Sequence, residues 1–224
     1  MNASRVLVIG ASRGIGLELV RQFRAEGARV NATARDDAGL ERVAALGAKA
    51  LRLDVADASS AAGLAWQIDG EAFDTVFVCA GILGPRTTGM TPPEESDFDA
   101  VMRTNVLGPM RIVSQLADLL APGAKVAMLS SRMGSIGTRS ATSGWLYRAS
   151  KAALNSVMKD SALVYAGRAV CISFHPGWVR TDMGGAGADL APEQSVSSMR
   201  RVIAGLKAED NGRFYDHDGT LIAF

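Results

Sequence analysis

Tyr147 and Lys151 are the two residues whose types and spacing best suit them to move a proton. They lie four residues apart in a stretch of helical period, so their side chains share one helix face and the ammonium can lie near the phenol. A neighbouring cation favours the phenolate and lowers the phenol's pKa from its reference value of about 10 toward the range useful in acid–base catalysis. Alone, such a pair is more often an ordinary helix surface, so the prediction depends on the other groups.

Two further polar side chains suit the same chemistry. Ser130 and Ser131 end a predicted strand and precede the segment that leads to the tyrosine, and Ser131 is our choice for the hydroxyl that binds a substrate oxygen. Asn105 lies inside a predicted helix, where Asn is a poor helix former, so we expect a local side-chain hydrogen bond or an ordered water there. The Gly108-Pro109 pair that follows predicts an irregularity in this helix.

A glycine-rich turn at residues 10–16 is placed to hold the phosphates of a dinucleotide. It lies between an apolar strand-like run and an amphipathic helix, where small residues let backbone N–H groups and a helix N-terminus approach a pyrophosphate. Its spacing differs from the G-x-G-x-x-G fingerprint, and a tight strand-to-helix connection is the alternative interpretation. The residues of the turn are Gly10, Ala11, Ser12, Arg13, Gly14, Ile15 and Gly16.

The second predicted strand ends at Arg35, where an acidic residue would hold the ribose 2′-hydroxyl of NAD(H). A guanidinium there, together with Arg13, fits a 2′-phosphate, so NADP(H) is the expected cofactor and NAD(H) the alternative. Asp36 and Asp37 follow directly and could instead pair with Arg35 or contact the ribose.

Asp54 and Val55 close the third predicted strand, and we expect them at the adenine edge of the cofactor. A helix cap or a surface charge is an equally ordinary use of Asp54.

Short β-branched apolar runs alternate with longer stretches of helical period, which is typical of a parallel sheet with helices on both faces. The prediction is an α/β fold, a Rossmann-type doubly wound parallel sheet of about seven strands, as a single domain over residues 1–224. The predicted strands are 5–10, 29–34, 48–53, 73–78, 125–130, 169–174 and a short last strand near 221–224. The predicted helices are 14–26, 37–46, 59–68, 95–120, 146–165 and 192–207.

Composition excludes several classes of protein. The 24 Lys and Arg residues balance 23 Asp and Glu residues to a net charge of +1, so no overall field would hold nucleic acid or an anionic membrane. No apolar run approaches the roughly 20 residues of a membrane-spanning helix, and the first residues lack a signal-peptide pattern, so we expect a cytoplasmic protein. Cys79 and Cys171 lie in apolar runs and are expected to be reduced core thiols rather than a disulfide or metal site.

The order and spacing of these groups resemble the short-chain dehydrogenase/reductase family over nearly the whole chain. The resemblance is carried by Gly10-x-x-x-Gly14-Ile15-Gly16, Cys79-Ala80-Gly81, Asn105, Ser131, Tyr147-x-x-x-Lys151 and Pro176-Gly177. The stretches at 130–135, 147–151 and 175–185 are most similar to the branch that contains the bacterial cell-contact C-factor and the sniffer-type carbonyl reductases.

This resemblance implies hydride transfer between NADP(H) and a carbonyl or alcohol substrate, with Asn105, Ser131, Tyr147 and Lys151 as catalytic residues. Tyr147 would be the acid in carbonyl reduction, Lys151 would lower its pKa, Ser131 would orient the substrate oxygen, and Asn105 would anchor a proton-relay water. The further cofactor contacts that it implies are Ala80, Gly81, Pro176, Gly177, Val179 and Thr181. It also implies a homodimer or homotetramer through the helices at 95–120 and 146–165. The alternative is a cofactor-binding signalling or sensor protein of the C-factor type that acts through a partner contact.

The chain departs from the family's pattern at two positions. The family commonly has Thr before its first glycine and Asn before the Ala-Gly pair, where this chain has Ile9 and Cys79. We expect these changes to affect a bond between the first strands rather than the chemistry. The segment 131–147 is also slightly longer than usual, which leaves Ser130 or Ser135 as substitutes for Ser131, whereas His175 is interpreted as structural.

Overall fold

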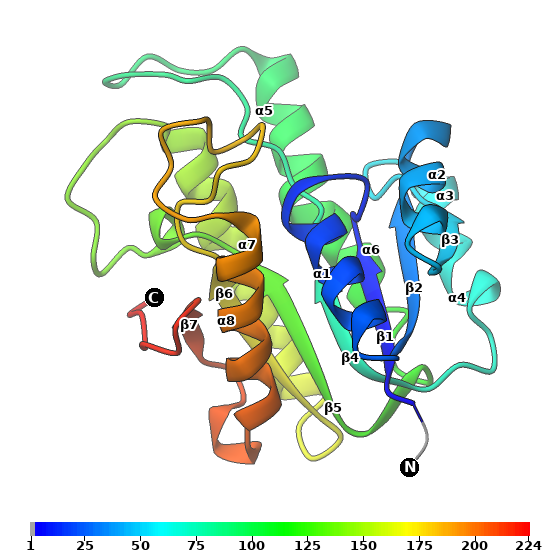
Figure 1. Cartoon of the computed structure of the whole chain (residues 1–224). Coiled ribbons are helices and arrows are strands. Elements are labelled where there is room, and N and C mark those ends of the chain that lie inside the picture. The colour runs from blue at the N-terminus through cyan, green and yellow to red at the C-terminus, as the bar shows by residue number, and fades with distance from the viewer. Residues whose placement is uncertain (1–2) are drawn as a thin grey trace.

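The computed structural model describes residues 3–224 and is built around one seven-stranded sheet (Figure 1). Neighbouring strands are parallel throughout, in the order β3-β2-β1-β4-β5-β6-β7. The strands are β1 (Arg5–Ile9), β2 (Arg29–Ala34), β3 (Lys49–Arg52), β4 (Phe73–Val78), β5 (Leu120–Leu129), β6 (Ala169–His175) and β7 (Phe214–Asp216). The predicted doubly wound α/β fold is therefore confirmed.

Helices cover both faces of this sheet, as the continuous apolar strands require. On one face, apolar residues of α1, α2 and α8 pack against the strands, among them Leu19, Val43 and Met199. On the other face, α4, α6 and α7 bury residues that include Leu64, Ile112 and Met158. The helix bounds are α1 (Gly14–Ala25), α2 (Asp37–Ala45), α3 (Ala58–Ala62), α4 (Leu64–Gln67), α5 (Glu95–Met102), α6 (Gly108–Val113), α7 (Trp145–Val164) and α8 (Pro192–Gly205). No helix within residues 3–224 is long and apolar enough to cross a membrane.

The single helix predicted at 95–120 is wrong in extent. The chain forms α5, then a π-helix at Arg103–Leu107, then α6, which ends at Val113, and β5 already begins at Leu120. The predicted irregularity is confirmed, because Asn105 lies in the π-helix, and Pro109, which has no N–H to donate to the preceding turn, follows directly in α6. Single π turns of this kind are frequent at functional sites.

Two other predicted elements also differ. The helix predicted at 59–68 breaks at Gly63 into α3 and α4. The last strand is β7 rather than 221–224, because the buried residues Phe214 and Tyr215 continue the sheet beside β6. Gly219, with a φ of +96°, then turns the chain back, so that Leu221 makes only an isolated antiparallel bridge to Tyr215.

The order of the strands in the sheet indicates where a ligand would bind. Strand β1 pairs with β2 on one side and with β4 on the other, so the chain direction across the sheet reverses at β1. Ligands of open α/β sheets bind in the crevice beyond the carboxyl ends of the strands at such a reversal.

Candidate active site

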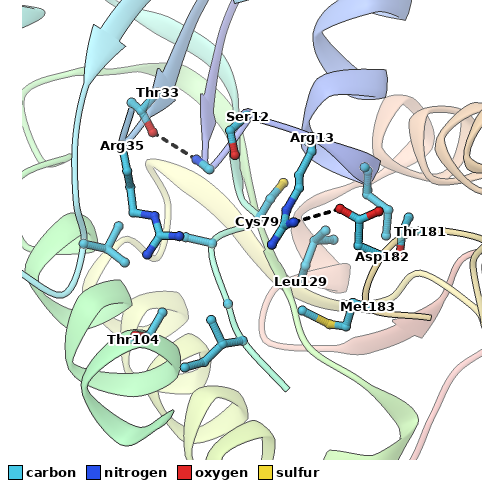
Figure 2. A pocket seen from close by; sticks show the side chains of 18 of the residues that line it. Ser12, Arg13, Thr33, Arg35, Cys79, Thr104, Leu129, Thr181, Asp182 and Met183 are labelled. Atoms are coloured by element: carbon cyan, nitrogen blue, oxygen red, sulfur yellow. Dashed lines mark hydrogen bonds and ion pairs between the residues drawn. The ribbon is translucent and has the colours of Figure 1, made fainter. Parts of the chain in front are cut away.

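A cleft of about 430 Å³ lies at the carboxyl ends of the central strands (Figure 2). Most of the residues predicted for the site line it: Gly10, Ser12, Arg13, Gly14, Ile15, Gly16, Arg35, Asp54, Val55, Ala80, Gly81, Tyr147, Lys151, Pro176 and Thr181. Four predicted residues lie outside its lining: Asn105, Ser131, Gly177 and Val179. Of these, Val179 is 4% exposed and bridges to Leu190. The residues that line the cleft come from segments far apart in the sequence.

The glycine-rich turn packs against neighbouring backbone more closely than a residue with a Cβ would allow. A Cβ at Gly10, whose φ is +84°, would lie 2.7 Å from the backbone nitrogen of Ala80, and one at Gly16 would lie 2.2 Å from the carbonyl oxygen of Gly10. Helix α1 begins at Gly14 with no acidic residue in its first turn and no side-chain cap. Its free N–H groups and positive end fit the pyrophosphate of a dinucleotide.

Thr33 supports this turn, and sequence reasoning missed it. Its Oγ1 accepts a hydrogen bond of 2.9 Å from the backbone N–H of Gly10, and the side chain is 1% exposed. The carbonyl oxygen of Ile9 accepts hydrogen bonds from the backbone N–H groups of Cys79 (2.8 Å) and Ala80 (3.1 Å). Backbone atoms therefore join β1 to β4 despite the departures at Ile9 and Cys79. The sequence signal that could have identified Thr33 is a polar residue inside an otherwise apolar strand.

Arg35 extends into the cleft without an acidic partner (Figure 2). Asp36 caps α2 by accepting a 2.7 Å hydrogen bond from the N–H of Gly39, and Asp37 pairs with Arg52. Neither acid pairs with Arg35, which forms no ion pair within residues 3–224, whereas a contact of either acid with the ribose stays a prediction. An unpaired guanidinium at this strand end fits a 2′-phosphate.

Arg13 behaves differently from Arg35. Its Nη1 lies 2.7 Å from Oδ2 of Asp182, a residue of the segment after β6, and both side chains are exposed. Figure 2 shows this pair within the cleft. Asp182 also escaped the sequence prediction, although it lies within the motif at 175–185 that carried the resemblance. The carboxylate of Asp54 accepts a 2.9 Å hydrogen bond from the N–H of Ala56, so a turn engages one of its oxygens.

The Tyr147 phenol and the Lys151 ammonium lie together in the buried part of the site. Lys151 Nζ is 5.6 Å from the centre of the tyrosine ring and donates a 2.8 Å hydrogen bond to the carbonyl oxygen of Leu129. Burial raises the pKa of Tyr147 to about 12, and the neighbouring Ser131 hydroxyl acts in the opposite direction. Burial also lowers the pKa of Lys151 to about 8.

The predicted lowering of the Tyr147 pKa by Lys151 is therefore not met in this structure. Desolvation of a phenolate outweighs the other influences, and Ser131 rather than Lys151 opposes it. At neutral pH the phenol is protonated, which is the form that an acid in carbonyl reduction needs.

The candidate serines have different partners. Ser131 is 8% exposed and its Oγ accepts a 3.1 Å hydrogen bond from the N–H of Met133. Ser130 Oγ donates to the carbonyl oxygen of Lys151 at 3.3 Å. Ser135 Oγ donates a 2.5 Å hydrogen bond to the carbonyl oxygen of Ala223 and is fully buried, so it holds the end of the chain. Ser130 lines the cleft, whereas Ser131 lies beside the Tyr147 phenol, so the contact of either serine with a substrate oxygen stays a prediction.

Asn105 is completely buried and its amide is engaged. Its Oδ1 accepts a hydrogen bond from the N–H of Ile82, and its Nδ2 donates to the carbonyl oxygen of Ile82, both at 2.8 Å. Nδ2 also donates to Ser150 Oγ at 3.0 Å. The side chain therefore ties the π-helix to the loop after β4 and to α7. Its role toward a proton-relay water stays a prediction.

Two residues that the sequence assigned to packing have shifted pKa values. Cys79 lines the cleft, and burial raises the pKa of its thiol while Lys151 acts in the opposite direction. His175 ends β6, where burial lowers its pKa to about 4 against the opposing effect of Asp216, so the imidazole is neutral at pH 7. Its Nδ1 is buried without a hydrogen-bond partner.

Known proteins resemble this chain in sequence and in fold. The family model described as short chain dehydrogenase matches residues 4–189. C-signal from Myxococcus xanthus is 41% identical over 130 residues, which cover 57% of this chain and 78% of that protein. The crystal structure of a short-chain dehydrogenase/reductase from Burkholderia multivorans with bound NADP has a TM-score of 0.90 and 32% identity, with full coverage of both chains. The carbonyl reductase Sniffer of Drosophila melanogaster has a TM-score of 0.90 and 28% identity, again with full coverage of both chains.

Proposed function

Because this chain belongs to the short-chain dehydrogenase/reductase family, we propose that it is an NADP(H)-dependent oxidoreductase that reduces carbonyl compounds to alcohols. The observation that carries the proposal is the content of the cleft, which holds a glycine-rich turn and the unpaired Arg35 as well as the buried Tyr147–Lys151 pair. The first two suit a phosphorylated dinucleotide and the third suits proton transfer. A bare structural domain would have no use for this combination.

The residues present fit NADP(H). Gly10 and Gly16 let the turn fold tightly, because a Cβ at either position would collide with neighbouring backbone atoms, and the N–H groups of this turn would cradle a pyrophosphate while Arg35 would hold the 2′-phosphate. The similar Burkholderia multivorans structure contains NADP, which agrees with this choice. Asp54, Val55, Ala80, Gly81 and Thr181 are proposed as further cofactor contacts, and all five line the cleft.

The chain's own part in the reaction is the placement and transfer of a proton. When bound, NADPH supplies the hydride that the carbonyl carbon accepts. The Tyr147 phenol donates its proton to the carbonyl oxygen as negative charge develops there, and the Ser131 hydroxyl donates a hydrogen bond to the same oxygen. The Ser131 hydroxyl opposes the desolvation of the phenolate that remains, while the Lys151 ammonium, held by Leu129, lies 5.6 Å from the centre of the tyrosine ring, and a proton from water restores the phenol.

A second candidate function is favoured by the match to C-signal: a cofactor-binding signalling protein that acts through a partner contact. Exposed apolar residues on α5, the π-helix and α6 (Phe98, Leu107 and Met110) also agree with a homodimer or homotetramer built on these helices. The reductase proposal explains the buried Tyr147–Lys151 pair, which a signalling surface would not require.

Depletion of NADPH and of NADH by the purified protein, with a panel of aldehydes, ketones, quinones and diketones, tests the proposed function. We expect turnover with at least one class of carbonyl compound and a higher kcat/KM with NADPH than with NADH. Equal use of both cofactors would contradict the role of Arg35. Tight NADPH binding without turnover across the panel would favour the signalling candidate.

A further inference from the structure

The turn that follows Ser131 rests directly on α7. A Cβ at Gly134 would lie 2.7 Å from the carbonyl carbon of Lys151, so only glycine lets the turn come this close to the helix. The N–H of Gly134 donates a 2.7 Å hydrogen bond to the carbonyl oxygen of Ser131, and the N–H of Met133 donates to the Ser131 hydroxyl at 3.1 Å. The position of this turn therefore sets the position of the Ser131 hydroxyl relative to α7.

Residues 214–224, which we call the strap, hold the other side of the same turn. The backbone N–H groups of Ile136 (2.6 Å) and Gly137 (2.9 Å) both donate hydrogen bonds to the main-chain oxygen of Phe224. The Phe224 ring stacks on the ring of Phe214, a buried residue of β7, with 5.8 Å between the ring centroids. Figure 1 shows the strap, in red, beside the loop that leads to α7. The turn is thereby tied to the edge strand of the sheet.

Two side chains of the turn add to this attachment. The Ser135 hydroxyl is fully buried and donates a 2.5 Å hydrogen bond to the carbonyl oxygen of Ala223. Arg132, at the start of the turn, forms an ion pair with Asp216, whose side chain is 9% exposed. The other carboxylate oxygen of Asp216 accepts a 2.7 Å hydrogen bond from the N–H of His217. A buried carboxylate needs such partners, so the ion pair holds the turn against the strap.

The strap reaches this turn without lining the cleft. No residue of 214–224, a range that the structure describes in full, belongs to the lining. The glycine-rich turn and Arg35, which we propose to hold the phosphates of the cofactor, follow β1 and β2, and three strands separate β1 from β7. A change in the strap should therefore reach Ser131 and leave the phosphate contacts unchanged.

We propose that Arg132 and Ser135 are positioning residues of the reductase, and that through them the strap holds the Ser131 hydroxyl beside the Tyr147 phenol. This inference rests on the proposed function. Proton donation to the substrate oxygen needs the phenol and the hydroxyl in one fixed arrangement, and a displacement of about 1 Å can slow such a step on the order of a hundredfold. The strap thus acts on the chemical step rather than on cofactor binding.

Single-turnover reduction tests the proposal, with NADPH-loaded protein mixed with a saturating concentration of the best carbonyl compound of the panel. We expect the rate of NADPH consumption to fall on the order of tenfold in Arg132→Gln and in Ser135→Ala, with an unchanged Kd for NADPH. Arg132→Lys should have an intermediate rate, because an ammonium can still pair with Asp216. Arg213→Gln is the matched control and should keep the wild-type rate, since Arg213 pairs with Asp210 rather than with the turn.

A double variant shows whether Arg132 acts through the strap. Arg132→Gln combined with Asp216→Asn should be no slower than Arg132→Gln alone, because both changes break the same ion pair. Effects that multiply would mean that the arginine acts by another route and would overturn the proposal. The Arg132 side chain is 60% exposed, so its variants should fold even if Ser135→Ala does not. A wild-type rate in Arg132→Gln, or a rate that falls only in step with NADPH affinity, would also overturn the proposal.

Hydrogen–deuterium exchange supplies a readout that needs no turnover. The amides of Met133 and Gly134, which donate to Ser131, should exchange faster in Arg132→Gln than in the wild type or in Arg213→Gln. If the wild type reduces no compound of the panel, the proposed function fails, whereas faster exchange in Arg132→Gln still supports the hold of the strap on Ser131. Unchanged exchange in Arg132→Gln would overturn the inference whether or not the protein is a reductase.

Discussion

Replacement of Thr33 by Val removes one oxygen from beneath the glycine-rich turn and changes little else. The two side chains have nearly the same shape, and Thr33 is 1% exposed, so no cavity forms. The N–H of Gly10 loses the acceptor that lies 2.9 Å away. An unpartnered buried N–H costs about 1–3 kcal/mol of the free energy of unfolding. For a protein of this size, we therefore expect Tm to fall by roughly 2–12 °C.

The affinity of Thr33→Val for NADPH should fall together with its Tm, because Gly10 begins the turn that would cradle the pyrophosphate. Differential scanning fluorimetry measures Tm, and a fluorescence titration measures the Kd of NADPH. Thr33→Ser is the control, since it keeps the acceptor and loses only a methyl group, and its Kd should stay near the wild-type value. If Thr33→Val melts and binds NADPH as the wild type does, Thr33 is not what holds the turn.

Three further predictions concern single groups. Arg35→Ala should raise KM for NADPH on the order of tenfold to a hundredfold and change KM for NADH far less in steady-state assays, whereas equal effects would place the 2′-phosphate elsewhere. Because the pKa of Lys151 is about 8, kcat/KM for carbonyl reduction should fall as pH rises through that value, and Lys151→Arg should move the fall to higher pH. A pH–rate profile that is flat between about pH 7 and 10 would contradict this role of the ammonium. The pKa of His175 is lowered from 6.5 to about 4, so the unfolded chain binds more protons between these values and the free energy of unfolding should fall as pH drops through this window. Urea unfolding at pH 5 and pH 8 should show that His175→Asn reduces this loss; a loss of unchanged size would mean that another group causes it.

The elements with strong local patterns could be predicted from the sequence. Strands buried on both faces are apolar throughout, as Arg5–Ile9 and Phe73–Val78 show, and the glycine-rich turn sits where a strand passes into a helix. The long helix predicted at 95–120 failed because a π turn has no reliable sequence pattern, although Asn105 and Pro109 marked its place. Strand β7 was misplaced because pairing with β6 is a tertiary property of a segment only three residues long.

Most of the residues that line the cleft could be predicted from the sequence, but the pKa shifts within it could not. The spacing of Tyr147 and Lys151 brought them together as expected. The direction of the Tyr147 pKa depended on how deeply the fold buries the phenol, which spacing does not reveal. Thr33 escaped for a similar reason, because its importance comes from a partner on another segment, the N–H of Gly10.

The central claim is that Tyr147 supplies the proton for a hydride transfer in this cleft. It is tested most directly by incubating the wild type and Tyr147→Phe with NADPH deuterated at C4 and an accepted carbonyl substrate, and measuring deuterium in the product alcohol by mass spectrometry. The wild type should place one deuterium on the carbinol carbon, and Tyr147→Phe should do so roughly a hundredfold more slowly or worse while it binds NADPH with an unchanged Kd. Transfer at the wild-type rate by Tyr147→Phe would contradict the account.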